Sequence, residues 1–216
     1  MNWLAHLYLA RQSEDAMLGA LLGDFVFGSS ELEDFGPIVR REILVHRRID
    51  AFTDSHPAVT ALRARFPEGR RRYAGIALDV YFDHLLARDW ARWSTTALEA
   101  FTARAYSMLG ARSAVLPARL RAIAPAIAAD DWLGSYRHRD SVDLAVTRIA
   151  ARLSRNGERL VGCLEDLRGL EDEARSAFDA LFPALCGFAD AERARWNAGA
   201  GPQPSATRSR PPRLAS

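Results

Sequence analysis

The stretch PIVRREILVHRRIDAFTD, residues 37–54, decides the fold. Pro37 suits the first turn of a helix, because its fixed φ and its missing N–H are both tolerated there. Apolar residues then recur at helical spacing on one expected face: Ile38, Val45, Ile49 and Phe52. This pattern predicts a long amphipathic helix that packs into a core.

Helical patterns continue on both sides of this segment. Upstream, Ser13 is placed to cap a helix whose apolar stripe comprises Met17, Leu18, Leu21, Leu22 and Phe25. Downstream, a third apolar face comprises Leu78, Phe82, Leu85, Leu86 and Trp93. Further helices are expected over residues 97–109, 117–128, 130–154, 158–168 and 171–195. Sustained alternation of apolar and polar residues is missing, so strands are not expected.

The composition fits one globular domain. The chain has 216 residues, of which 49% are hydrophobic, enough to fill a large core. No run reaches the roughly 18 apolar residues that span a bilayer, and the N-terminus lacks the pattern of a signal peptide. We therefore expect a cytoplasmic protein with buried free thiols at Cys163 and Cys186. The fold expected is an all-α, single-domain helical bundle over residues 1–196, followed by a disordered Pro/Ser/Arg tail over residues 197–216.

Charge is distributed unevenly although the formal net charge is only +2. Residues 14–34 are acidic, with six carboxylates and no basic residue. Residues 63–72 hold five arginines against Glu68. A basic face of this kind is usually a solvated surface, but it can also attract an acidic or phosphorylated partner. No nucleic acid and no membrane is expected as a partner.

Histidines and aspartates gather in three of the predicted helical segments. His6 lies in the apolar stretch NWLAHLYLA, and Asp24 lies at the edge of the Leu21/Phe25 stripe. A carboxylate near a buried face must be paired, hydrogen-bonded or bound to a metal to offset its desolvation. No basic residue within four positions of Asp24 could neutralise it locally, which makes Asp24 a candidate site residue.

The second and third segments repeat this composition. In HRRID, His46 and Asp50 are four apart and share one helix face. In LDVYFDHLL, Asp79 and Asp83 are one turn apart and His84 follows directly. Each of these sets could be structural on its own, as an ion pair, a surface doublet or a core histidine. Together they predict a divalent metal site in the bundle, because imidazole and carboxylate ligands from several helices commonly build one.

At these same residues the chain resembles the acyl carrier protein phosphodiesterases. The resemblance runs through MNWLAHLYLA, LLGDFVFG at 21–28, HRRIDAFTDSHP at 46–57 and LDVYFDHLLARDW at 78–90. It continues more weakly at DWLGSYRHRD, residues 131–140, and through residues 149–160. It implies an all-α fold related to the HD-domain metal phosphohydrolases. The doublet at 83–84 is Asp-His rather than the His-Asp of the ordinary HD pattern.

The resemblance also implies a reaction. Members of that family hydrolyse the phosphodiester between 4'-phosphopantetheine and a serine of holo-acyl carrier protein, using Mn²⁺ or a similar ion such as Mg²⁺. The residues it implies as metal ligands are Asp24, His6, His46, Asp83 and His84, with Asp50 and Asp79 as ligands or as groups that orient the histidines. Asp24, His46, Asp83 and Arg47 are the implied catalytic residues.

Substrate contacts are expected from arginines and aromatic residues. Arg47, Arg48 and Arg137 could hold the non-bridging phosphate oxygens. Tyr136 and Trp132 could line a channel for the pantetheine arm, although aromatic residues at this spacing are more often core residues. Since acyl carrier proteins are acidic, residues 63–72 become a candidate docking face.

Two other functions fit the same sequence. One is a metal-dependent nucleotidase or other small phosphoester hydrolase that uses the same helices. The other is a non-catalytic helical module that binds carrier proteins or other acidic partners.

Overall fold

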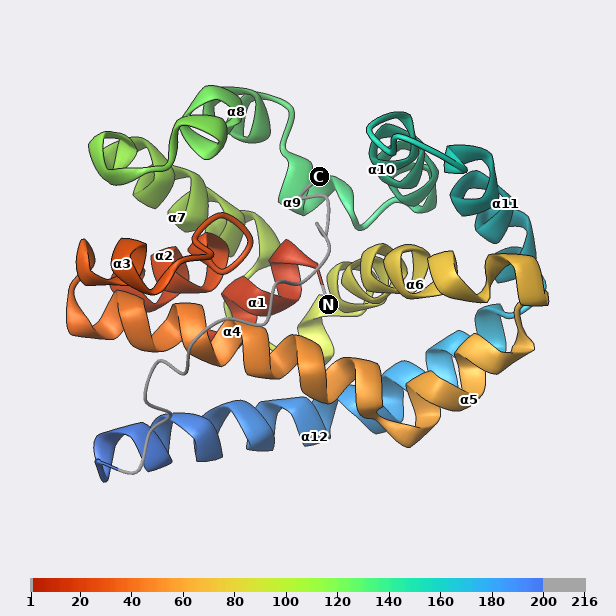
Figure 1. The fold of residues 1–216 in the computed structure, drawn as a ribbon, viewed down its shortest axis with the longest axis horizontal. Helices are drawn as coiled ribbons and strands as arrows, with labels where there is room; N and C mark the ends of the chain where they lie inside the picture. The colour runs from red at the N-terminus through yellow and green to blue at the C-terminus, as the bar shows by residue number, and fades with distance from the viewer. Residues whose placement is uncertain (1, 200–216) are drawn as a thin grey trace.

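The computed structural model describes residues 2–199, and every regular element within them is a helix (Figure 1). The first six α-helices are α1 (Trp3–Leu9), α2 (Glu14–Leu22), α3 (Ser29–Glu33), α4 (Pro37–Ser55), α5 (Pro57–Arg65) and α6 (Glu68–Arg88). The next six are α7 (Leu98–Ala111), α8 (Ala118–Ala129), α9 (Trp132–Ser135), α10 (Arg139–Ala151), α11 (Gly157–Arg168) and α12 (Glu171–Asn197). Two 3₁₀ turns lie between these helices: η1 (Trp90–Arg92) between α6 and α7, and η2 (Ser113–Val115) between α7 and α8. The all-α prediction is confirmed.

Helices α2 and α4 pack closely, and small residues make this possible. A Cβ added at Gly19 would lie 2.5 Å from the Val39 carbonyl oxygen and 2.7 Å from the Glu42 Cβ. The predicted helix starts are confirmed as well. The Ser13 Oγ accepts a hydrogen bond from the Ala16 N–H at 3.1 Å, and Pro37 is the first residue of α4.

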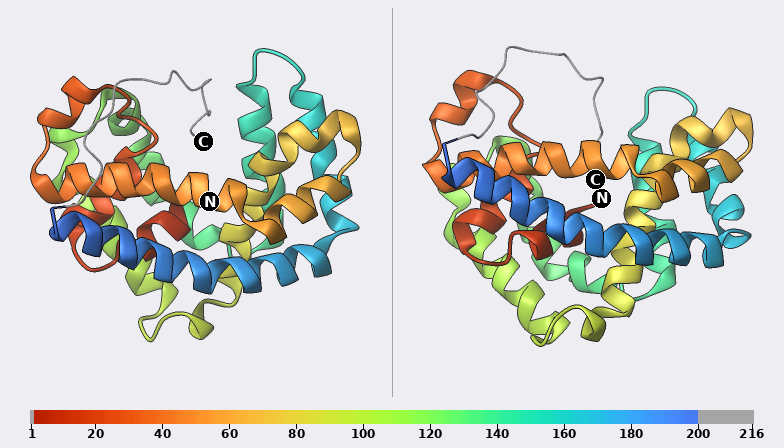
Figure 2. Two further views of the ribbon diagram at one scale, coloured as in Figure 1. Left: turned by 60° about the horizontal axis from the view of Figure 1, so that its bottom comes forward. Right: turned by 90° about the horizontal axis from the view of Figure 1, so that it is seen from below.

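Helix α12 runs beside α4, as both views of Figure 2 show. Buried ion pairs join the two helices. The Arg193 guanidinium donates to the Glu42 carboxylate at 2.9–3.1 Å, and Glu192 pairs with Arg48 at 2.7 Å. Glu42 and Glu192 are both buried, and each also pairs with a second arginine, Arg41 at 2.9 Å and Arg195 at 3.0 Å, so both buried carboxylates are compensated by cations.

The main core lies around α6, which contacts α1, α5, α10, α11 and α12. Its largest fully buried side chains include Phe66, Phe82, Phe178 and Phe182. The Phe178 and Phe182 rings stack with centroids 5.0 Å apart. One continuous cluster of buried apolar residues thus connects the N-terminal helices to α12.

Several details differ from the sequence-based expectations. Trp93, expected on the apolar face of the third helix, follows η1 and lies outside α6, which ends at Arg88. Ile38 is 39% exposed rather than part of the buried face of α4. The helix expected to carry Phe25 ends at Leu22. The single helix expected over residues 130–154 is divided into α9 and α10 by a turn at 136–138. Helix α9 ends there because the carbonyl of Tyr136 is bound by the His84 side chain rather than by a following turn of helix.

Other expectations concern the membrane, the cysteines and the C-terminal end. Within residues 2–199 no helix is both long and apolar enough to cross a membrane. Cys163 and Cys186 are free thiols, the first buried and the second half-buried. The tail predicted from residue 197 falls, over residues 200–216, outside the described residues. The domain boundary at 196/197 therefore stays a prediction.

Candidate metal centre

Four of the predicted site residues meet at one point, and we call them the His/Asp cluster: His6, Asp24, His46 and Asp50. His6 comes from α1, Asp24 from the turn after α2, and the other two from α4. The His6 Nε2 lies 3.1 Å from the Asp50 Oδ1. The His46 Nε2 lies 3.6 Å from the Asp50 Oδ2 and 3.4 Å from the Asp24 Oδ1. The two imidazole rings stack with centroids 3.8 Å apart.

Backbone geometry fixes the place of Asp24. Helix α2 ends at Leu22, and Gly23 then passes against the His46 ring. A Cβ at Gly23 would lie only 2.2 Å from the His46 Cγ, so this close approach requires glycine. The Trp3 indole N–H donates to the Asp24 Oδ2 at 3.0 Å. Asp24 is therefore held from both sides, by α1 and by the end of α2.

The orientation of His46 is set by the backbone of α2. Its Nδ1 donates to the Ala20 carbonyl oxygen at 2.7 Å, so its Nε2 points at the two carboxylates. A carbonyl partner on one ring nitrogen is the usual way in which a protein fixes the other for a ligand role. Sequence spacing placed His46 and Asp50 on one face, but only the packing of α2 reveals this hydrogen bond.

The charges in the cluster favour a bound cation. Burial lowers the pKa of His6 to about 4, with His46 as a second cause, so His6 is a neutral donor at neutral pH. Burial would raise the pKa of Asp50, but His46 and the hydrogen bond from His6 hold it well below its ordinary value. Burial also opposes the charged form of His46, yet Asp24 and Asp50 raise its pKa. The two carboxylates thus attract positive charge to the His46 Nε2.

The His/Asp cluster fits a small divalent ion. Two imidazoles and one carboxylate, from His6, His46 and Asp50, are ligands that manganese, magnesium or zinc sites use in differing proportions, and Asp24 lies beside them. Ligand atoms about 2.1 Å from one ion lie roughly 3.0–3.4 Å from each other, close to the 3.1–3.6 Å observed here. The potential ligand atoms of His6, His46 and Asp50 all lie within 4.8 Å of one another. In addition, the buried His6 Nδ1 has no hydrogen-bond partner.

The Asp83–His84 pair takes another role. The Asp83 carboxylate accepts hydrogen bonds from the backbone N–H groups of Leu4 and Ala5, at 2.8 and 3.1 Å. It therefore caps the first turn of α1, where the Asn2 side chain makes no capping bond. The His84 Nδ1 donates to the Tyr136 carbonyl oxygen at 2.7 Å.

Through these contacts the Asp83 and His84 side chains bind backbone groups of α1 and of the turn after α9, and neither side chain joins the His/Asp cluster. Desolvation raises the pKa of Asp83 to about 7, although its two N–H partners oppose this shift. Asp79 lies one turn before Asp83 and is half-buried.

The predicted substrate-binding residues are also placed by specific contacts. The Arg47 guanidinium donates to the Val26 carbonyl oxygen at 2.7 Å and so holds the loop that follows Asp24. Arg48 pairs with Glu192, as described above. Arg137 pairs with Glu99 and, at 3.3 Å, with Asp131. Tyr136 is buried, and its hydroxyl accepts a hydrogen bond from the Asn2 Nδ2 at 2.8 Å.

Sequence reasoning missed two residues that shape the cluster, Trp3 and Gly23. Trp3 stands in an apolar stretch that predicts core packing, and nothing in that pattern indicates a hydrogen bond to Asp24. The role of Gly23 could have been predicted from the sequence, because Gly19 and Gly23 are one helical turn apart. Glycines at this spacing indicate a helix face that another backbone approaches closely.

Comparison with known proteins now adds a family. A family model described as "Acyl carrier protein phosphodiesterase" matches residues 1–185. A protein of that name from Serratia proteamaculans (strain 568) is 36% identical over 186 residues, which is 86% of this chain and 95% of the relative. One from Escherichia coli O45:K1 (strain S88) is 38% identical over the same shares of both chains. No solved structure matches, so the relation to HD-domain proteins stays a prediction.

Proposed function

The chain belongs to the acyl carrier protein phosphodiesterase family, and from this premise we propose that it releases 4'-phosphopantetheine from holo-acyl carrier protein. The match spans most of this chain and nearly the whole length of the relatives, so the family assignment rests on the helical domain and not on one short motif. The products are apo-acyl carrier protein, with its serine hydroxyl restored, and free 4'-phosphopantetheine.

The observation that carries this proposal is the His/Asp cluster. Its inner members are almost inaccessible, since the side chains of His6, His46 and Asp50 are 1%, 2% and 5% exposed. The Asp24 side chain is 23% exposed. The cluster is thus closed on the protein side and reachable from the side of Asp24. A phosphodiester would approach there.

The residues of the cluster have different roles in the proposed hydrolysis. A divalent ion bound here would polarise the phosphodiester and lower the pKa of an attacking water. His6, His46 and Asp50 would hold that ion, and Trp3 and His46 orient Asp24. Asp24, at the exposed edge, accepts the proton of the water. The water oxygen forms its bond to phosphorus while the bond to the serine oxygen breaks, and the serine oxygen takes up the proton that Asp24 accepted from the water.

We include Mn²⁺ or Mg²⁺ as the ion and a cytoplasmic location in this proposal, as inferred from the sequence. We also keep residues 63–72 as a docking face for the carrier protein, but we expect its contribution to be small. Arg70 pairs with Asp166 at 2.5 Å, Arg65 with Glu173 at 3.4 Å and Arg63 with Asp54 at 3.9 Å. These arginines already have partners within the chain, so the contribution of this face to carrier binding is small and sensitive to salt.

The test is an intact-mass assay of holo-acyl carrier protein incubated with this protein and Mn²⁺, with and without EDTA. We expect a loss of mass equal to the phosphopantetheine group, abolished by EDTA and by Asp24→Ala. Asp34→Ala is the matched control, because Asp34 is exposed at the end of α3. Retained activity in Asp24→Ala would refute the role given to the cluster.

The same assay, combined with measurements of nucleotide turnover and of carrier binding, separates the two alternatives. A small phosphoester hydrolase would leave holo-carrier protein intact and turn over free nucleotides in an EDTA-sensitive manner. A non-catalytic module would bind the carrier in a salt-sensitive manner and release no product, whether or not Asp24 is changed.

A further inference from the structure

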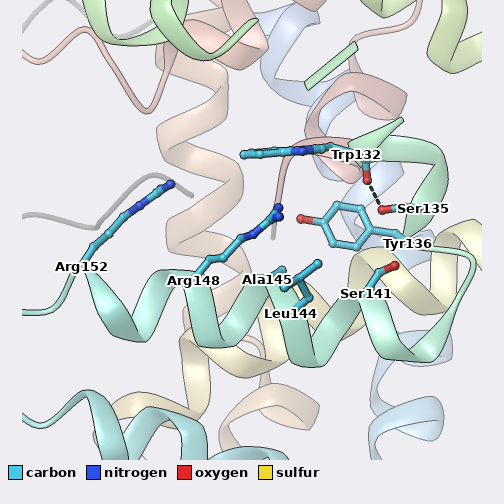
Figure 3. Close-up of a pocket in the computed structure, with 8 residues that line it drawn as sticks. All are labelled: Trp132, Ser135, Tyr136, Ser141, Leu144, Ala145, Arg148 and Arg152. Carbon is cyan, nitrogen blue, oxygen red and sulfur yellow. Dashed lines mark hydrogen bonds between the residues drawn. The ribbon is translucent and has the colours of Figure 1, made fainter. Parts of the chain in front are cut away.

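A second site lies between α9 and α10, outside the His/Asp cluster. Its cavity volume is about 40 Å³, so it is a shallow, open groove rather than one of the enclosed sites of roughly 300–1,000 Å³ that bury a small ligand. Figure 3 shows the Trp132 ring held across from α10, with the Tyr136 hydroxyl and the Arg148 guanidinium pointing into the space between them. Leu144 and Ala145 of α10 add an apolar floor.

The wall formed by α9 is held firmly. The Tyr106 hydroxyl donates to the Asp131 carboxylate and accepts the Leu133 N–H, both at 2.9 Å. His84 holds the Tyr136 carbonyl oxygen from the other side. Trp132 is therefore presented by an anchored turn, and the pocket is formed before any ligand binds.

Arg148 is one of two arginines that line this pocket, the other being Arg152 (Figure 3). The Arg148 guanidinium lies 5.4 Å from the centre of the Trp132 ring. Within the part of the chain that the structure describes, no carboxylate forms an ion pair with it, whereas Arg137 is committed to Glu99 and Asp131. Leu144 is 51% exposed beside it. An exposed apolar side chain next to an arginine with free donors suits a chain that is apolar in part and carries amide or hydroxyl oxygens.

The pocket is joined to the His/Asp cluster by direct contacts. The Tyr136 hydroxyl in its wall accepts a hydrogen bond from Asn2, the next residue is Trp3, and the Trp3 indole donates to Asp24. Two consecutive residues thus separate the pocket from the exposed edge of the cluster. A bound arm of about a dozen covalent bonds would extend roughly 15 Å, and it would have to span the positions of Asn2 and Trp3 to bring its phosphate to the cluster.

We infer that this pocket binds the pantetheine arm of the substrate, with the Trp132 face and Leu144 contacting its methyl groups and Arg148 donating to its amide carbonyl oxygens. This inference rests on the proposed function for the identity of the arm. It makes Arg148 a substrate-binding residue for the arm, whereas Arg137, which the sequence suggested for the phosphate oxygens, pairs with Glu99 and Asp131.

The experiment uses a substitution that fills the pocket, Ala145→Phe, and one that removes its wall, Trp132→Ala. The matched control is Thr147→Phe, which adds the same ring at an exposed position of α10 that does not line the pocket. Binding of pantetheine, which has no phosphate, is measured by ligand-observed NMR. Turnover is measured with holo-acyl carrier protein and with bis(p-nitrophenyl) phosphate, which has no arm.

We expect both pocket variants to lose pantetheine binding and Thr147→Phe to keep it. For the pocket variants, kcat/KM for holo-carrier protein should fall at least about tenfold more than kcat/KM for the small diester. Pocket variants that match Thr147→Phe in both measurements would overturn the inference.

The two proposals can fail separately. Pocket-dependent binding of pantetheine without release from the carrier would support the pocket and refute the reaction. Release from the carrier that the pocket variants leave unaltered would support the reaction and refute the pocket. A wild-type protein that neither binds pantetheine nor acts on the carrier would refute both.

Discussion

Two pairs of the same side chains, His46 with Asp50 on α4 and Asp83 with His84 on α6, are used in different ways. The first pair faces other ligand-type side chains, namely His6 and Asp24. The second pair faces backbone, because Asp83 caps α1 and His84 holds the Tyr136 carbonyl oxygen. Both pairs are buried, so burial does not distinguish them. What distinguishes them is the kind of atom that each pair meets.

This difference teaches how a buried carboxylate is compensated. Asp83 receives neutral N–H donors, and its pKa is raised to about 7 because desolvation outweighs them. Asp50 receives imidazoles, and its pKa is held well below the ordinary value. At neutral pH, therefore, the α4 pair attracts a cation whereas the α6 pair stabilises the start of a helix.

The sharpest way to break this comparison is to remove one histidine from each pair. We expect His46→Ala to lower carrier hydrolysis well beyond the roughly 100-fold seen for outer partners of metal ligands, and to lose bound Mn²⁺. His84→Ala should keep the metal, because its ring contacts backbone. Metal content after dialysis and initial rates check both variants. The reverse result, with metal lost only in His84→Ala, would overturn our division of roles.

The second test addresses stability at Asp83. Asp83→Ala leaves two buried N–H groups of α1 without acceptors, so we expect the free energy of unfolding to fall by about 2–4 kcal/mol. Asp83→Asn keeps one acceptor oxygen and should lose less. Urea denaturation measures both. Equal stability of Asp83→Ala and the wild type would show that α1 does not depend on this cap.

The third test addresses the close approach of α2 to the α4 pair. In Gly23→Ala the new Cβ would displace the His46 ring, so Mn²⁺ affinity should fall about 10- to 100-fold. The control is Gly110→Ala in α7, where an added Cβ meets nothing within 4 Å. Metal titration followed by calorimetry measures both variants. Unchanged affinity in Gly23→Ala would mean that the His46 position is not set by α2.

The smallest expected effect is the pH dependence of the α6 pair. Because the folded-state pKa of Asp83 is raised, its stabilising contribution is complete below pH 4 and is lost as the pH rises through about 7. The wild type should therefore lose about 1 kcal/mol relative to Asp83→Asn between pH 6 and pH 8. Urea titrations of both proteins at each pH isolate this group from the histidines. A constant difference between them would contradict the raised pKa.

Much of the fold could be predicted from local patterns. Helix starts at Ser13 and Pro37 and the breaks at glycine and proline follow from neighbouring residues. The division of residues 130–154 could not be predicted, because the partner that ends α9 is His84, about fifty residues away. Periodicity alone also failed at Ile38, which is exposed in the first turn of α4 although Val45 and Ile49 of the same predicted face are buried.

The sequence by itself determined the all-α architecture, the family and the set of residue types from which a metal centre could be drawn. Helical periodicity is local, and family motifs are read along the chain. Only the tertiary structure decided which histidines and aspartates converge. The geometry of His6, Asp24, His46 and Asp50 depends on three elements packing together, and the same packing turns Asp83 and His84 toward backbone. A side chain takes its chemistry from the atoms that surround it, and residues distant in sequence supply those atoms.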